Sequence, residues 1–167
     1  MRARKPVSAE AALERMRVLC ARSEQCSGDV AEKLRRLGIS GGDARRIIDE
    51  LEAGRYIDDG RYARAFAYSM MQFSGWGRRK IRLALCGKHI ASGVIRDSVE
   101  ELKEDEYEAV LERVLSVKAR GVDIESSEGR NKVYRSMIAR GFESEKITEA
   151  IRRLRERRKE DEDRGDC

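Results

Sequence analysis

The chain has little of what enzymes usually carry in their active sites. Its 167 residues include one histidine, one tryptophan and one proline, and aromatic residues make up 5% of the sequence. There is no glycine-rich phosphate-binding loop, and no pair of carboxylates lies on an apolar background that would raise a pKa for acid–base chemistry. The single histidine is the one possible base for a serine or cysteine nucleophile, and nothing marks a partner for it. We therefore expect no catalytic site and no enzyme.

Metal-binding and membrane-spanning patterns are missing as well. Cys20, Cys26, Cys86 and Cys167 form no Cys-x-x-Cys pair, whereas a zinc site needs Cys and His ligands clustered at short spacing, so no metal or other cofactor is expected. Scattered single thiols fit a reducing compartment better than a disulfide framework. No apolar run of signal-peptide length follows the basic residues 1–6, and none approaches the roughly 20 apolar residues of a membrane span. The sequence predicts a cytoplasmic protein without a membrane partner.

The residues that are abundant favour helices. Ala, Leu, Arg, Glu and Lys are good helix formers, and a single proline leaves few forced interruptions. No stretch alternates apolar and polar residues for long enough to predict a half-buried strand. Because 40% of the residues are charged, the apolar material suits thin helical layers better than one thick core. The predicted fold class is all-α.

One apolar pattern occurs three times, at a spacing of about fifty residues, which is typical of repeat proteins. Leu51, Leu102 and Leu154 end the three copies. The preceding positions are Val30, Leu34, Ile39, Ala44 and Ile48 in the first copy, Ile81, Leu85, Ile90, Ile95 and Val99 in the second, and Val133, Met137, Phe142, Ile147 and Ile151 in the third. We predict an elongated array of three tandem three-helix repeats. They span residues 1–55, 56–104 and 105–160, and an acidic tail follows at 161–167.

Capping residues predict where the helices begin and end. Ser8 is a suitable N-cap for a helix ending near Arg22, and Asp58 or Asp59 is suitable for the first helix of the second repeat. Gly38 and the corresponding Gly141 are expected to end helices in the left-handed conformation. His89 occupies the same slot, and histidine tolerates positive φ better than most residues. The expected helices lie at about 8–22, 27–37, 42–53, 58–71, 78–88, 92–103, 105–119, 127–140 and 144–159.

Negative charge is absent from the middle of the chain. The segment from Gly60 to Arg96 has no Asp or Glu, and its basic residues are Arg61, Arg64, Arg78, Arg79, Lys80, Arg82, Lys88 and Arg96. Residues 78–82 fill the first turns of their helix, where each cation opposes the helix dipole by roughly a few tenths of a kcal/mol. No folding benefit is visible in the sequence, which favours binding to an acidic partner or a phosphate backbone over an ordinary solvated basic face.

Most of the aromatic residues lie within or beside this acid-free segment. Basic residues interleaved with aromatic ones suit phosphate attraction combined with stacking, or an interface anchored by rings. Tyr62, Phe66 and Phe73 share a helical spacing and are expected to form the buried stripe of their helix. Tyr68 lies off that stripe and is expected to be exposed. Trp76, flanked by glycines, is either a packing lid or an interface anchor.

The middle of the chain resembles the signature of the bacterial RecX regulatory proteins. The resemblance rests on residues 54–66, Gly-Arg-Tyr-Ile-Asp-Asp-Gly-Arg-Tyr-Ala-Arg-Ala-Phe, on Gly75, and on residues 80–90, Lys-Ile-Arg-Leu-Ala-Leu-Cys-Gly-Lys-His-Ile. The tandem three-helix repeats extend it over nearly the whole chain. The family usually has Glu near Ala84 and Gly at His89, so this chain departs from the pattern at two positions.

The resemblance implies a negative regulator of the RecA recombinase. Members of the family bind along the groove of the RecA filament on single-stranded DNA, inhibit ATP hydrolysis and strand exchange, and so temper recombination, DNA repair and the SOS response. We expect this chain to be a monomer whose basic middle repeat anchors it to that filament. Asp58 and Asp59 are expected to cap the helix that carries the first two of these cations. The expected RecA- or DNA-binding residues are Arg61, Arg64, Trp76, Arg78, Arg79, Lys80, Arg82 and Lys88.

Two alternatives stay open at this point. A protein that binds single- or double-stranded DNA could affect recombination by competing for DNA, and its affinity would fall steeply as salt rises. A general helical scaffold for another protein would bind neither RecA nor DNA. The near-balanced charge of the outer segments argues against a DNA-binding face along the whole chain, so protein recognition is the first hypothesis.

Overall fold

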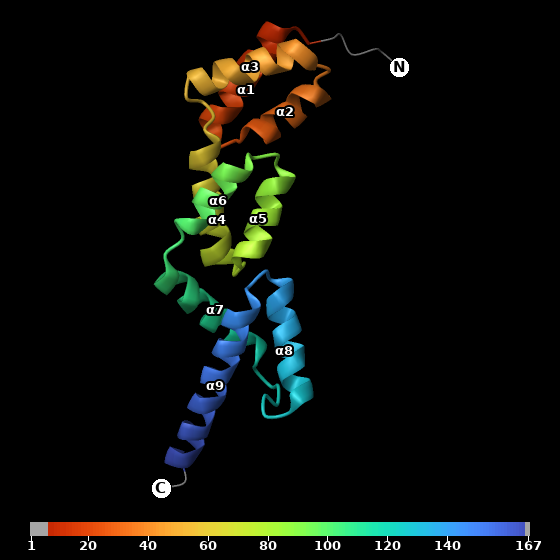
Figure 1. Cartoon of the computed structure of the whole chain (residues 1–167). Helices are drawn as coiled ribbons and strands as arrows, with labels where there is room; N and C mark the ends of the chain where they lie inside the picture. The colour runs from red at the N-terminus through yellow and green to blue at the C-terminus, as the bar shows by residue number, and fades with distance from the viewer. Residues whose placement is uncertain (1–6, 166–167) are drawn as a thin grey trace. The chain divides into compact units, whose positions relative to one another are not determined.

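The computed structural model describes residues 7–165, and these form α-helices joined by short loops (Figure 1). No β-strand occurs among the described residues. The helices follow one another in three sets of three, which confirms the predicted all-α class and the three-helix repeats. They are α1 (Ala9–Arg22), α2 (Ser27–Arg36), α3 (Gly41–Ala53), α4 (Asp59–Ser74), α5 (Arg78–Gly87), α6 (Ser92–Glu100), α7 (Glu104–Lys118), α8 (Ser127–Ala139) and α9 (Ser144–Gly165).

Most helix ends lie close to the predicted positions. The Ser8 hydroxyl accepts a hydrogen bond from the Ala11 amide at 3.2 Å and caps α1, as predicted. At the other end of the chain, α9 continues past the predicted residue 159 to Gly165. Glutamate–arginine pairs three and four residues apart stabilise an exposed helix, and Arg152 pairs in this way with both Glu149 and Glu156. No described helix is both long and apolar enough to cross a membrane.

The chain divides into two compact units. The first comprises the described residues up to Ala65 together with Leu85–Ser98, and the second comprises Phe66–Ala84 together with the described residues from Val99 onward. In the first unit, α1 and α2 each pack against α3. Their shared core consists of Ala12, Met16, Val30, Leu34, Ile39, Ile47, Leu51 and Ile57.

Two neighbouring aspartates, Asp58 and Asp59, stabilise the starts of two helices in the first unit. Asp58 accepts a hydrogen bond from the Arg61 amide at 2.8 Å and caps α4, as predicted. The neighbouring Asp59 has a different role, because its carboxylate accepts hydrogen bonds from the amide and the hydroxyl of Ser27 at 2.7 and 2.5 Å. Asp59 therefore satisfies a free amide at the beginning of α2, a role that a carboxylate commonly plays at a helix N-terminus.

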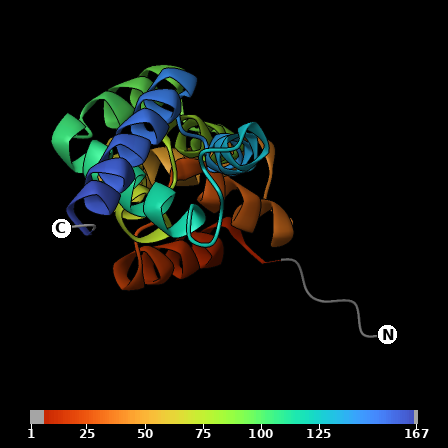
Figure 2. The ribbon, with the colours of Figure 1, turned by 90° about the horizontal axis from the view of Figure 1, so that it is seen from below.

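In the second unit, α7, α8 and α9 pack against one another. Figure 2 shows the loop of residues 119–126 that joins α7 to α8. The turn before α5 is joined to the turn after α8, because the Gly77 amide donates to the Arg140 carbonyl at 2.8 Å and the Arg79 amide to the Gly141 carbonyl at 3.0 Å. The largest fully buried side chains of this unit include Met71, Ile81, Tyr107, Leu115, Met137, Phe142 and Ile147.

The threefold apolar pattern accounts for much of the interior. Every one of its positions is buried except Ala44, Ile48 and Leu154, which are half-buried. In α3, Ile47 is buried as well as Leu51, while Ala44 and Ile48 pack against the edge of the same core. The positions after α2, α5 and α8 also agree with the prediction, because Gly38, His89 and Gly141 have φ values of 81°, 60° and 87°.

Candidate partner-binding surface

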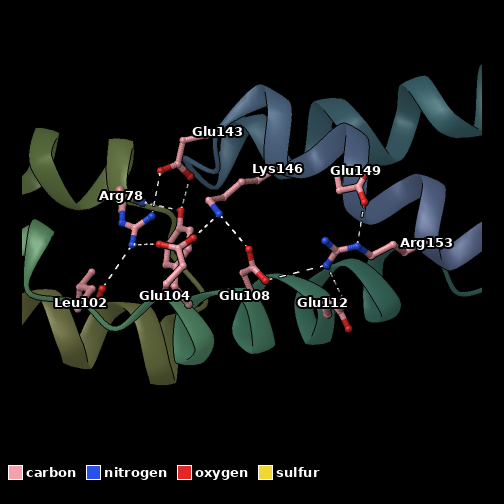
Figure 3. Close-up of polar contacts among 10 residues, drawn as sticks. Arg78, Leu102, Glu104, Glu108, Glu112, Glu143, Lys146, Glu149 and Arg153 are labelled. Atoms are coloured by element: carbon pink, nitrogen blue, oxygen red, sulfur yellow. Dashed lines mark hydrogen bonds and ion pairs between the residues drawn. The ribbon is translucent and has the colours of Figure 1, made fainter.

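The start of α5 is held by an ion-pair network that centres on Arg78. The Arg78 side chain is 13% exposed and lies 2.8 Å from the Glu104 carboxylate and 3.7 Å from that of Glu143. Its guanidinium also donates to the Leu102 carbonyl at 3.4 Å and lies 4.1 Å from the ring centroid of Tyr107. Figure 3 shows the Arg78 side chain at the start of α5 pointing toward Leu102 before α7, Glu104 of α7 and Glu143 in the turn before α9. Arg78 therefore has a folding role, and α7 and the turn before α9 supply the negative charge that the acid-free segment lacks.

The buried Tyr107 belongs to the same network and bonds to both Arg78 and Glu143. Its hydroxyl donates to the Glu143 carboxylate at 2.6 Å and accepts from the Arg78 amide at 3.1 Å, while the ring is fully buried. Burial, and then the hydrogen bond to Glu143, raise the pKa of the Tyr107 hydroxyl above its ordinary value. The phenol therefore remains protonated and acts as a hydrogen-bond donor at neutral pH.

Ion pairs continue from this network along α7 and α9. Lys146 bonds to Glu104 and Glu108, and Arg153 lies 3.0 Å from Glu149 and 3.7 Å from Glu112 (Figure 3). The bonds from Lys146 and Arg78 lower the pKa of Glu104. Because the acids of α7 are paired with the cations of α9, many of the charges of the third repeat are internally compensated.

One face of α5 carries cations that have no such compensation. Arg79 and Arg82 are exposed and form no ion pair with any described residue, and Leu83 beside them is 72% exposed. Spacings of three and four residues place these side chains on one helical face, opposite the fully buried Ile81. We call Arg79, Lys80 and Arg82 the α5 basic surface.

Lys80 and Trp76 are in contact at the edge of this surface. The Lys80 ammonium lies 4.5 Å from the centroid of the Trp76 ring, which favours the cation electrostatically. The indole also packs edge-on against Phe66, with 6.4 Å between ring centroids. Trp76 and Lys80 are both half-buried, so the indole packs inside the unit with one part and contacts the lysine with another.

The remaining predicted site residues lie in the first unit. Arg61 is paired with Glu24 at 2.8 Å, and Arg64 is exposed on the same helix. Lys88 pairs with Asp29 at 2.8 Å and lies 5.5 Å from the ring centroid of Tyr62. Arg61 and Lys88, like Arg78, thus have carboxylate partners within their own unit. Among the eight predicted residues, Arg79, Lys80 and Arg82 have no ion pair in the part of the chain that the structure describes, and their role in binding stays a prediction.

The aromatic stripe predicted for α4 is only partly correct. Tyr68 is exposed as predicted, but Phe73 is 84% exposed, so its predicted burial is wrong. The fully buried positions of α4 are Ala63, Ala67 and Met71, which follow a spacing of four residues. The helical periodicity is compatible with burying either the face with the rings or the face with the alanines. In the structure the face with Ala63 and Ala67 is the buried one. The exposed Phe73 is a feature that the sequence analysis missed.

Comparison with known proteins gives consistent matches. The family described as RecX, second three-helix domain, matches residues 58–98. Over 141 residues the chain is 28% identical to the regulatory protein RecX of Acinetobacter baylyi, covering 83% of this chain and 84% of that protein. It is 27% identical over 118 residues to the regulatory protein RecX of Lactobacillus johnsonii, and this match covers 70% of this chain but 44% of the longer relative.

Solved structures show the same fold. The crystal structure of RecX from Lactobacillus salivarius superposes with a TM-score of 0.79 over 87% of this chain and 96% of that chain, at 22% identity. At this level of identity the likeness concerns the fold alone. The family match lies in the segment that carries the α5 basic surface, and the relatives match over most of this chain and are named as regulatory proteins. The middle of the chain thus matches the second three-helix domain of RecX, and the chain over most of its length is similar to the RecX regulatory proteins.

Proposed function

We propose that this protein is a negative regulator of the RecA recombinase, which binds the RecA–DNA filament and inhibits its ATP hydrolysis and strand exchange. Its similarity to the RecX regulatory proteins supports a regulatory role, and the resemblance of residues 54–66 and 80–90 to the RecX signature directs that role to RecA. Through this inhibition the protein would modulate recombination, DNA repair and the SOS response. Residues 1–55, 56–104 and 105–160 would act as three repeats, with the middle one providing the electrostatic contact.

The observation that carries the proposal is the α5 basic surface. Arg79 and Arg82 form no ion pair with a described residue, lie beside an exposed leucine, and occupy helical turns where positive charge is locally unfavourable. An acidic protein surface or a phosphate backbone would compensate that charge on binding. Arg78 is excluded from this surface because its partners are internal.

The test is the DNA-dependent ATPase activity of RecA on single-stranded DNA, with this protein titrated from below to above the RecA concentration. The Arg79→Ala, Lys80→Ala, Arg82→Ala triple variant should need about tenfold more protein for half-inhibition, which corresponds to roughly 1.4 kcal/mol of binding. The matched control removes Arg15, Arg22 and Arg45, three exposed arginines of the first repeat without an ion pair to a described residue. This control has the same loss of charge and should inhibit nearly as well as the unchanged protein.

The remaining outcomes separate the alternatives. Inhibition at substoichiometric protein with DNA in excess supports action on the filament. Inhibition that disappears when DNA is added would instead indicate a competitor for DNA, and equal behaviour of the two triple variants would refute the role of the α5 basic surface.

A further inference from the structure

A groove lies beside the exposed Phe73 in the second unit. It has a volume of about 510 Å³ and is bounded by the end of α4, the turn at residues 74–75, the face of α7 and the end of α8. Phe73 from α4 and Val114 and Val117 from α7 contribute apolar surface to its lining. Phe73 is 84% exposed and Val117 is 50% exposed, so the groove presents apolar side chains that no described residue covers.

Gly75 brings the two walls of this groove together. It has a φ of 62°, and a Cβ atom at this position would lie 2.7 Å from the Val114 side chain. Only glycine therefore allows the turn to approach α7 so closely. The groove is consequently built into the backbone and does not depend on flexible side chains alone.

The charges around the groove are of one sign. Arg113, Lys118 and Arg140 line it, no Asp or Glu does, and none of the three forms an ion pair with a described residue. Arg113 donates to the Gln72 carbonyl at 2.6 Å, and Arg140 donates to the Ser74 carbonyl at 3.0 Å. These bonds hold both guanidinium groups in place, while each retains further N–H donors that could bind a carboxylate.

We propose that this groove binds an acidic peptide segment of a partner protein, with one large apolar side chain inserted between Phe73 and the valines of α7 and with carboxylates on Arg113, Lys118 and Arg140. The volume fits a few side chains, and the arginines are preorganised for carboxylates. The aliphatic valines favour an apolar side chain over a nucleobase, which would be expected to stack on a row of aromatic rings. The proposal does not depend on the identity of the partner or on the role of the α5 basic surface.

The experiment selects short random peptides displayed on phage against the full-length protein. The selected peptides are expected to combine Asp or Glu with a Leu, Ile, Met, Phe or Trp, and synthetic copies should bind in a fluorescence polarisation assay. Phe73→Ala and the pair Arg113→Glu, Lys118→Glu should each weaken that binding by at least about tenfold. Because the three altered side chains are exposed, these variants should keep their helical circular dichroism spectrum.

Matched controls lie outside the groove. Tyr68→Ala removes another exposed aromatic side chain of α4, and Lys132→Glu reverses an exposed charge on α8. Both should bind the selected peptides as the unchanged protein does, and so should the triple variant of the α5 basic surface. Failure of the selection, peptides without acidic residues, or equal binding by Phe73→Ala would overturn the proposal. It would also be overturned if labelled oligothymidine, but no peptide, lost affinity in the groove variants, since the groove would then be a nucleic-acid site.

Discussion

The ammonium nitrogen of Lys88 lies 2.8 Å from the carboxylate of Asp29, a residue that is 59 positions away in the sequence. The pair joins the end of α5 to the beginning of α2 within the first unit. The backbones of the two segments also approach closely here, because a Cβ atom on Gly28 would lie 1.8 Å from the Lys88 carbonyl oxygen. A basic residue of the acid-free segment thus stabilises the packing of two repeats within that unit.

The first prediction concerns the pH dependence of this pair. Burial by itself would raise the pKa of Asp29, but the hydrogen bonds and the charge of Lys88 lower that pKa below its ordinary value. The folded protein therefore binds this proton less readily than the unfolded chain, so the stabilisation is complete above the unfolded pKa of about 3.9 and is lost as pH falls through the folded pKa. Asp29→Asn should remove about 1 kcal/mol at neutral pH and flatten the acid decline of the unfolding free energy.

Urea unfolding between about pH 6 and about pH 3 measures this effect. Asp49→Asn, at an exposed position without an ion pair to a described residue, is the control and should leave the acid decline unchanged. A decline as steep in Asp29→Asn as in the unchanged protein would mean that the pair contributes nothing to folding. The pKa of Lys88 is raised by Asp29 despite its burial, so the lysine's own contribution is lost only at high pH, outside this window.

The second prediction separates the folding role of Arg78 from the exposure of Arg79. Arg78→Ala should lower the free energy of unfolding by about 2 kcal/mol, because it leaves the partly buried Glu143 without its cation and removes the contact with the Tyr107 ring. Arg79→Ala has the same loss of charge on the same helix and should change stability by less than about 0.5 kcal/mol. The measurement is the midpoint of urea unfolding, and equal midpoints for the two variants would contradict the network in Figure 3.

The third prediction exploits two corresponding turns that carry different residues. His89→Gly should raise stability by about 1 kcal/mol, because the exposed histidine is held at a φ of 60° that glycine adopts without strain. Gly141→Ala should lower stability by more than this, because its φ is 87° and a Cβ atom would lie 2.4 Å from the Lys80 amide nitrogen.

Thermal unfolding followed by circular dichroism compares these variants. Gly93→Ala is the control for adding a methyl group, since nothing lies within 4 Å of a Cβ atom there, and it should leave the melting temperature equal or slightly higher. A lower melting temperature for His89→Gly would show that the histidine side chain makes a stabilising contact that outweighs the strain of its backbone.

Much of the local structure was predictable from sequence. The apolar periodicity identified the second and third helices of each repeat, and the caps at Ser8 and Asp58 are where the pattern placed them. The left-handed conformation of His89 followed from its alignment with Gly38 and Gly141. These features depend on hydrogen bonds and steric limits within a few residues, so the order of residue types is sufficient to indicate them.

The candidate site was less predictable. Eight residues were selected for their charge or their ring, but the partners of Arg78 and Lys88 lie 26 and 59 positions away. The groove beside Phe73 combines three elements that are distant in the sequence, and its only local signal was an aromatic residue next to a glycine turn. The order of residues was sufficient to predict the helices, their repeat and the location of the basic segment. It did not reveal which of the cations are compensated or which ring is exposed, because ion pairing and burial depend on residues that folding brings together from separate helices.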